Sequence, residues 1–356
     1  MRVGLVLGAG GIQGGAWLTG GLDALALETG WDPAEADYVV GTSAGAMIGA
    51  LCASGIPPWF MVAHSRGEIF DGLVDAEGRP AADADRAAGA RFELVRTWPP
   101  FGPGSWRLAL RTLANPRRYT PATLATGWIP RGIFSTGALR ETIRRVVPAG
   151  WSPHPNLWIA TCDYVTGRRV PFGRPNSPDA DLADAVSASC AIPGFYHPVT
   201  IGGRRYVDGG IYSASNMDLL RAERLDLVIC LNPTSTLHPL RGALNPREWI
   251  NLGMRRASSQ RLGAESKRLH EVGTEVVVIQ PTDDDLQAMG PNLMSPRNRN
   301  RVIEVARRTV AEQIAEPRNR ELLDELPPGD PVALHRPEGS PDEWPDWRAI
   351  RSGNSG

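Results

Sequence analysis

The chain has 356 residues, a formal net charge of −1, 42% hydrophobic residues and 22% charged residues, all ordinary values for a globular protein. A chain of this length can bury a large core without help from disulfides or metals, and its balanced charge does not indicate a nucleic-acid partner. No apolar run reaches the roughly 20 residues that a membrane-spanning helix needs, and glycines interrupt the apolar residues after Arg2 too early for a signal peptide.

The four cysteines stand singly within apolar runs, without the close spacing that is typical of a metal site. They indicate buried thiols in a reducing compartment, so we expect a cytoplasmic protein. The sequence predicts no metal site and no cofactor. Nearly every cation is arginine, which is typical of proteins from GC-rich bacterial genomes. No feature of the sequence predicts an oligomeric state.

The N-terminal part contains two successive strand–loop–helix units. We expect a strand at 2–7, a glycine-rich turn at 8–15, a helix to about Glu28, a strand at 38–40 and a helix at 44–53. Further strands are expected at 157–162, 227–231 and 275–280, with helices at about 137–147, 181–190 and 297–315. Two hairpins, at 164–170 and 200–207, would add antiparallel strands. This alternation predicts an α/β fold, a three-layer sandwich with a mostly parallel central sheet.

Two segments depart from the alternation. Residues 57–133 are rich in tryptophan, proline and arginine, and they predict a helical or irregular cap inserted into a domain that spans 1–316. Residues 317–356 are rich in proline and charge, and they predict a loose C-terminal tail.

The run Gly41-Thr42-Ser43-Ala44-Gly45 follows the second strand and opens the second helix. A Gly-x-Ser-x-Gly turn in this position holds a serine hydroxyl away from the backbone, and a side chain at Gly41 or Gly45 would obstruct the turn. Ser43 is therefore a candidate nucleophile at a helix N-terminus, where the dipole favours developing negative charge. The alternative is that Ser43 only caps the helix.

The first turn, Gly8-Ala9-Gly10-Gly11-Ile12-Gln13-Gly14-Gly15, exposes backbone N–H groups just before a helix, a setting that favours anions. One use is a pyrophosphate cradle, although glutamine at position 13 breaks the dinucleotide fingerprint. The other use is an oxyanion hole formed by N–H groups near Gly10, Gly11 and Ile12. Because the carboxyl ends of neighbouring parallel strands meet at one edge of a sheet, we expect this turn to lie near Ser43.

Asp208-Gly209-Gly210 places a carboxylate at the end of a short strand, where an ordinary turn is the simpler interpretation. Together, however, the glycine-rich turn, the serine turn and this later aspartate resemble the patatin-like phospholipase family in kind and in order. The segment Ala188-Ser189-Cys190-Ala191-Ile192-Pro193-Gly194-Phe195 is also similar to the family's segment before its aspartate. The resemblance covers about 1–55 and 134–315. Ala9 and Gln13 depart from the family pattern, which usually has glycine and a cation at these positions.

The resemblance implies a lipid acyl hydrolase that cleaves carboxylic esters with a Ser43–Asp208 dyad. Asp208 would accept the proton of Ser43 and later activate water, and no metal would be required. A carboxylate with an ordinary pKa near 3.9 is a weak base for an alcohol, so this chemistry needs a dry site and a strong oxyanion hole.

Two other functional classes stay open at this point. A dinucleotide- or anion-binding domain would use the glycine-rich turn without esterase activity. An α/β-hydrolase would complete a triad with a late histidine, for which His270 and His335 are the candidates, although its nucleophile normally comes much later in the chain.

Between Arg86 and Arg131 the chain has eight arginines and one acid, Glu93, interleaved with Trp98, Trp106 and Trp128. This composition predicts peripheral contact with an anionic membrane surface. The alternative is that the tryptophans fill the core of the cap and the arginines pair with acids elsewhere. No nucleic-acid-binding motif accompanies the charge.

Overall fold

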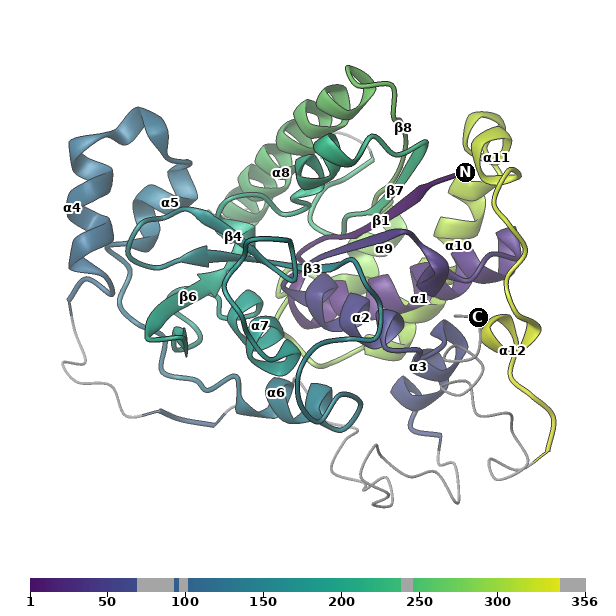
Figure 1. Ribbon diagram of the computed structural model, residues 1–356, viewed down its shortest axis with the longest axis horizontal. Coiled ribbons are helices and arrows are strands. Elements are labelled where there is room, and N and C mark those ends of the chain that lie inside the picture. Colours follow the sequence, from purple (N-terminus) through teal and green to yellow (C-terminus); the bar gives the residue numbers. More distant parts are fainter. Residues whose placement is uncertain (69–92, 96–101, 238–245, 340–356) are drawn as a thin grey trace.

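The computed structural model of the chain describes residues 1–68, 93–95, 102–237 and 246–339. In these residues an eight-stranded sheet lies between two layers of helices (Figure 1). The strands are β1 (Val3–Leu7), β2 (Tyr38–Thr42), β3 (Leu157–Asp163), β4 (Arg169–Phe172), β5 (Val199–Ile201), β6 (Arg204–Asp208), β7 (Leu227–Leu231) and β8 (Glu275–Ile279). Hydrogen-bonded pairs of strands follow the path β5-β6-β3-β2-β1-β7-β8, and β4 also pairs with β3.

Five neighbouring strands, β3, β2, β1, β7 and β8, run parallel. The hairpin strands β4, β5 and β6 are antiparallel to their partners. The predicted α/β class, the mostly parallel sheet and both hairpins are therefore confirmed.

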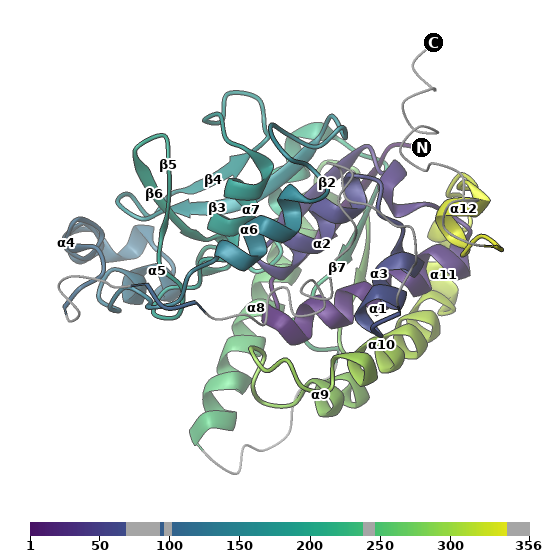
Figure 2. The ribbon, with the colours of Figure 1, turned by 90° about the horizontal axis from the view of Figure 1, so that it is seen from below.

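The larger helices are α1 (Gly11–Thr29), α2 (Ala44–Ala53), α3 (Pro58–Ser65), α4 (Trp106–Ala114), α5 (Pro121–Thr126), α6 (Gly137–Arg144), α7 (Leu182–Ser189), α8 (Pro246–His270), α9 (Asp283–Met289) and α10 (Arg299–Ile314). Figure 1 shows α8 on one face of the sheet and α2, α6 and α7 on the other, and Figure 2 shows α1 packed along α10.

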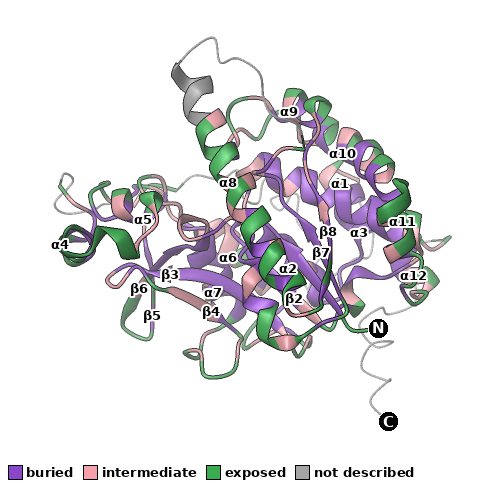
Figure 3. Cartoon of the chain, turned by 90° about the horizontal axis from the view of Figure 1, so that it is seen from above, coloured by how far each residue is buried: buried purple, intermediate pink, exposed green. Residues whose placement is uncertain are grey.

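Alternate residues of the parallel strands supply two separate cores, as expected for a sheet that is covered on both faces. Leu5 and Leu7 of β1 pack with α1, α2 and α10, whereas Val6 packs with α8 and the 3₁₀ helix η5 (Met217–Glu223). The buried residues in Figure 3 follow the strands and the inner faces of these helices.

The start of the predicted insertion needs correction. Helix α3 is buried over most of its length and places Trp59, Phe60 and Met61 in the main core, beside α1. The departure from the α/β core therefore begins after Ser65 rather than at residue 57. Part of the predicted insertion, 69–92 and 96–101, lies outside the described residues.

The expectation of a loose tail is wrong for its first part. Helices α11 (Pro317–Leu323) and α12 (Pro331–Leu334) bury Leu323 and Leu334, and the indole N–H of Trp59 donates to the carbonyl of Val332 at 3.0 Å. Proline and charge at the surface of these short helices concealed the apolar residues on their inner sides. Residues 340–356 lie outside the described residues.

Residues 102–133, here called the α4–α5 arm, lie beside the β3 and β6 end of the sheet (Figure 2). The arm is attached through Leu108, which packs with Cys162, Tyr164 and Val207. Thr120 and Thr123 of the arm also donate hydrogen bonds to the carbonyl of Ile211, just after the Asp208 turn. Among the described residues, none of the helices combines the length and the apolar composition that spanning a membrane requires.

Candidate functional site

Ser43 occupies a strained turn between β2 and α2. Its φ of 54° lies in the left-handed region that non-glycine residues rarely adopt, as expected where a serine is held out from a strand-to-helix turn. A Cβ at Gly41 would lie 2.6 Å from the Cα of Ala46, and a Cβ at Gly45 would lie 2.0 Å from the carbonyl oxygen of Leu7. Both glycines are thus required by close backbone approach.

Two neighbouring side chains hold the backbone of Ser43. Its N–H donates to the hydroxyl of Ser189 at 2.9 Å, and that hydroxyl donates to the carbonyl of Ala160 at 2.7 Å. The thiol of Cys190 donates to the carbonyl of Ser43 at 3.2 Å. The segment that resembles the family's segment before its aspartate therefore holds the Ser43 turn in place.

Strands β2 and β6 bring Ser43 and Asp208 together along one edge of β3. Thr42, the last residue of β2, pairs with Ala160, and Asp208, the last residue of β6, pairs with Thr161. Since β4 occupies the other edge of β3 at these residues, β2 and β6 run toward each other on the same edge. Their ends face one another, so the two side chains meet at the same level of the sheet.

Asp208 is buried, and burial raises the pKa of its carboxyl group to about 6. Hydrogen bonds from the N–H of Gly210 and from the side chain of Ser43 act in the opposite direction and lower this pKa. The bond from Gly210 to Oδ1 measures 2.7 Å. A Cβ at Gly209 would lie 2.4 Å from the carbonyl oxygen of Ala160, so this turn also needs its glycine.

The glycine-rich turn lies next to the Asp208 turn, since a Cβ at Gly210 would lie 3.4 Å from the Cβ of Ala9. In the described part of the chain, no acceptor is found for the backbone N–H groups of Gly10, Gly11 and Ile12. Gly11 and Ile12 line the same cavity as Ser43. A Cβ at Gly8 would lie 2.5 Å from Oδ1 of Asn232, and a Cβ at Gly10 would lie 2.6 Å from Pro233, while Gly14 packs against the same proline.

Gln13, which stands where the family usually has a cation, is buried beneath this turn. Its side-chain amide donates to the carbonyls of Ser295, at 2.7 Å, and Arg297. Its backbone N–H donates to the carbonyl of Leu293 at 2.9 Å. The neutral glutamine thus ties the first turn of α1 to the segment 293–297, and Met294 of that segment lines the cavity.

The cavity next to Ser43 has a volume of about 290 Å³. Most of its wall is apolar, and it is formed by α1, α2, α3 and α6 together with the segments around Cys190 and Met294. Its polar or charged side chains include those of His64, Arg145 and Arg299. This arrangement suits a flexible apolar chain that ends at the serine.

Sequence reasoning missed the residues that shape this cavity. The wall formed by Phe60, Met61 and His64 belongs to α3, which falls within the predicted insertion, and no described residue of the α4–α5 arm contributes. The uninterrupted apolar run Pro58-Trp59-Phe60-Met61-Val62 was the signal that could have identified this wall as part of the core.

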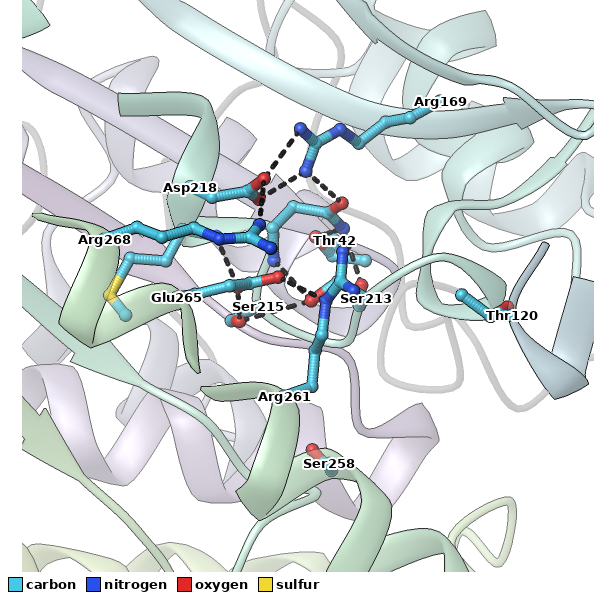
Figure 4. Close-up of polar contacts among 12 residues, drawn as sticks. Thr42, Thr120, Arg169, Ser213, Ser215, Asp218, Ser258, Arg261, Glu265 and Arg268 are labelled. Carbon is cyan, nitrogen blue, oxygen red and sulfur yellow. Dashed lines mark hydrogen bonds and ion pairs between the residues drawn. The ribbon is translucent and has the colours of Figure 1, made fainter. Parts of the chain in front are cut away.

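A buried polar network supports the site from the α8 side of the sheet (Figure 4). The side-chain amide of Asn216 donates to the hydroxyl of Thr42, the residue before the nucleophile, at 3.0 Å. The fully buried Glu265 of α8 accepts bonds from the Ser215 hydroxyl and from the Arg261 guanidinium. Burial and the nearby Asp218 raise the pKa of Glu265. The hydrogen bond from Ser215 and the charge of Arg261 act in the opposite direction and stabilise its ionised form.

The two histidines considered for a triad are exposed, and neither lines the cavity next to Ser43. All four cysteines are buried and free, as predicted. Among the described residues, no group of three or more His, Cys, Asp or Glu side chains could hold a metal ion.

The crystal structure of VipD from Legionella pneumophila is similar to this chain, with 15% sequence identity and a TM-score of 0.40, over 91% of this chain and 67% of VipD. The family model for patatin-like phospholipases matches residues 5–221. That range, which is more than half of the chain, includes the glycine-rich turn, the Ser43 turn, the Ser189-Cys190 segment and the Asp208 turn. The chain therefore belongs to the patatin-like phospholipase family.

Proposed function

We propose that the chain is a lipid acyl hydrolase that cleaves carboxylic esters through a Ser43–Asp208 dyad. The observation that carries the proposal is the buried Asp208 carboxyl group, which contacts the Ser43 side chain beside an apolar cavity. Membership of the patatin-like phospholipase family supports lipid acyl hydrolase activity in general.

In the first half of the proposed reaction, the Ser43 hydroxyl attacks the ester carbonyl and Asp208 accepts its proton. A pKa of about 6 makes Asp208 a stronger base than an exposed aspartate and leaves it mostly ionised at neutral pH. The N–H groups of Gly10, Gly11 and Ile12 would bind the oxyanion. Asp208 then returns the proton to the leaving alcohol, which departs and leaves the acyl group on Ser43.

In the second half, Asp208 takes a proton from water as the water attacks the acyl-enzyme. The tetrahedral intermediate collapses, the C–O bond to Ser43 breaks, and the proton returns to the serine. Every proton moves through Asp208, so no histidine, metal or cofactor is needed.

The proposed substrate is a lipid whose acyl chain lies in the apolar cavity. Its walls include Ile48, Leu51, Ile56, Leu139 and Val146, which would desolvate a hydrocarbon chain. We also propose that the enzyme meets lipid at a membrane surface through the segment 86–131. A dinucleotide- or anion-binding domain would leave unexplained the buried carboxyl group that contacts Ser43.

Labelling with a fluorophosphonate probe tests the proposal, because the probe reacts only with an activated serine. We expect covalent labelling of Ser43 that is lost in Ser43→Ala, and loss of ester hydrolysis in Asp208→Asn. His270→Ala and His335→Ala are the matched controls and should retain activity. Loss of hydrolysis in a folded histidine variant would favour an α/β-hydrolase triad, and a folded protein that never labels would contradict the enzyme.

A further inference from the structure

A second cavity, of about 220 Å³, lies between the α4–α5 arm and the catalytic strand β6. Its wall contains three arginines from separate segments: Arg107 of α4, Arg131 after α5, and Arg205 of β6. Among the described residues, the rest of the wall is formed by Pro103, Gly104, Ser105 and Trp106, and none of these side chains is acidic. The three positive charges are brought together only by the fold.

The three guanidinium groups are not neutralised within the described parts of the chain, since none of them forms an ion pair there. Arg131 donates through Nε to the carbonyl of Gly104 at 3.1 Å, and Arg205 lies over the ring of Tyr164 at 5.8 Å. Burial together with the charges of Arg131 and Arg107 lowers the pKa of Arg205. Each contact leaves guanidinium N–H groups free for an anion.

An exposed apolar surface adjoins this cavity. Trp106 is 61% exposed and packs edge to face with Trp128, which is 43% exposed, at a centroid distance of 6.2 Å. Leu110 and Leu113 follow Trp106 at helical spacing on α4 and are 60% and 61% exposed. The two described tryptophans therefore do not fill the core of the arm, where Leu108 is buried instead.

Arginines beside exposed indoles and leucines match the chemistry of a bilayer surface. Indole rings settle at the level of lipid head groups, leucines insert among the acyl chains, and guanidinium groups bind phosphate in a bidentate manner. A free anion would account for the three arginines but would leave the exposed apolar side chains without a partner. An anionic phospholipid in a membrane accounts for both.

We propose that the cavity lined by Arg107, Arg131 and Arg205 binds the head-group phosphate of an anionic phospholipid while Trp106, Leu110, Leu113 and Trp128 enter the bilayer surface. The proposal deepens the lipid contact proposed above by naming the lipid class and the residues that bind it, but it does not depend on hydrolysis. Arg205 lies on the strand that ends at Asp208, so docking would orient the catalytic strand relative to the membrane.

Sedimentation of the full chain with vesicles tests the proposal. We expect binding to phosphatidylcholine vesicles that contain phosphatidylglycerol and little binding to phosphatidylcholine alone. Arg107→Gln and Arg205→Gln should each weaken binding roughly fivefold, the equivalent of about 1 kcal/mol per charge near an anionic surface. Trp106→Ala should weaken it as well. Arg107→Gln is the variant that should disturb the fold least, because Arg107 is exposed and its side chain has no hydrogen bond to a described residue.

Arg117→Gln and Arg118→Gln are the matched controls, because both arginines are exposed on the same arm but do not line the cavity. They should weaken binding clearly less than the cavity variants. Equal losses from both sets would show a diffuse electrostatic attraction and overturn the proposal. So would equal binding to neutral vesicles, or inorganic phosphate that binds the cavity as tightly as a short-chain phosphatidylglycerol does.

Two further measurements separate this proposal from the proposed function. Ser43→Ala should bind vesicles as the parent protein does, and Arg107→Gln should hydrolyse a soluble short-chain ester at the parent rate. A chain that binds vesicles but hydrolyses nothing would contradict only the esterase, and a chain that hydrolyses esters without binding vesicles would contradict only the docking site.

Discussion

Ser43 and Asp208 stand at the facing ends of two strands, β2 and β6, that pair with successive residues on one edge of β3. Neither strand alone creates the site. The parallel strand brings the serine to the carboxyl edge of the sheet, and the antiparallel strand brings the aspartate back to the same level. This relationship explains how the proposed nucleophile and its proposed base can meet without a histidine between them.

The pH dependence of ester hydrolysis should follow Asp208. Since the ionised carboxylate is the proposed base, kcat/KM for a soluble ester should fall as pH drops through about 6, the raised pKa of this group. Below that pH the loss should approach tenfold per unit. A pH–rate profile measured on the free enzyme checks this, and a profile that stays flat across that range would exclude Asp208 as the base.

The same burial predicts that Asp208→Asn is more stable than the parent protein in mildly alkaline solution. Because the folded-state pKa of about 6 lies above the unfolded value, the folded state favours the protonated carboxyl. The carboxyl group therefore destabilises the fold increasingly as pH rises from the unfolded value to about 6, and the full penalty, up to about 3 kcal/mol at 1.36 kcal/mol per pKa unit, persists above that pH. Asparagine removes this penalty.

Urea unfolding at about pH 8 and again at about pH 4 measures this difference. The variant should be the more stable protein at the higher pH. The difference should shrink toward zero at the lower pH, because the Asp208 carboxyl group of the parent becomes protonated in both the folded and the unfolded state. A variant that is less stable at both pH values would show that Asp208 stabilises the fold rather than straining it.

Gln13→Glu should lower kcat with little change in KM. The new carboxylate would face the carbonyls of Ser295 and Arg297, to which the amide now donates, and would displace the first turn of α1. Movement of one oxyanion donor reduces kcat strongly, so we expect a loss of roughly tenfold or more.

Gln313→Glu is the control for this variant, because the amide of Gln313 also donates to two carbonyls, those of Gln280 and Thr309, but in α10. Both variants should lose stability, and only Gln13→Glu should lose kcat. If the two variants retained the same kcat, Gln13 would have no role in positioning the oxyanion turn.

Gly15→Leu should abolish selectivity for long acyl chains. Gly15 lines the cavity in the interior of α1, and a Cβ there would meet only the Cβ of Ala44 at 3.9 Å, so a larger side chain would extend into the cavity. Hydrolysis of long-chain esters should fall at least tenfold relative to acetate esters, an effect of about 1.4 kcal/mol on the transition state. Gly15→Ala, the matched control, should keep both activities. Equal loss on all chain lengths would place the acyl chain elsewhere.

The sequence predicted the fold class and most elements because buried strands such as 227–231 have unbroken apolar runs between clear turn residues. It also predicted the residues that now lie together in the site, since the strained serine turn and the glycine-rich turns have strict local requirements. The sequence did not predict how these residues are placed relative to one another, because that placement depends on the pairing of β3 with β2 and β6, which are distant in the chain. For the same reason, the Arg205 contribution to the arginine cavity could not be read from the segment 86–131.

Strand β3 sets the distance between Ser43 and Asp208. Its residues Ala160 and Thr161 pair with Thr42 and Asp208 and so set the separation of the proposed nucleophile and its base. One residue inserted between Ala160 and Thr161 would increase this distance by about 3.3 Å and reverse the side-chain alternation in the rest of β3. Such a change would separate the two residues of the proposed dyad while leaving every sequence motif intact.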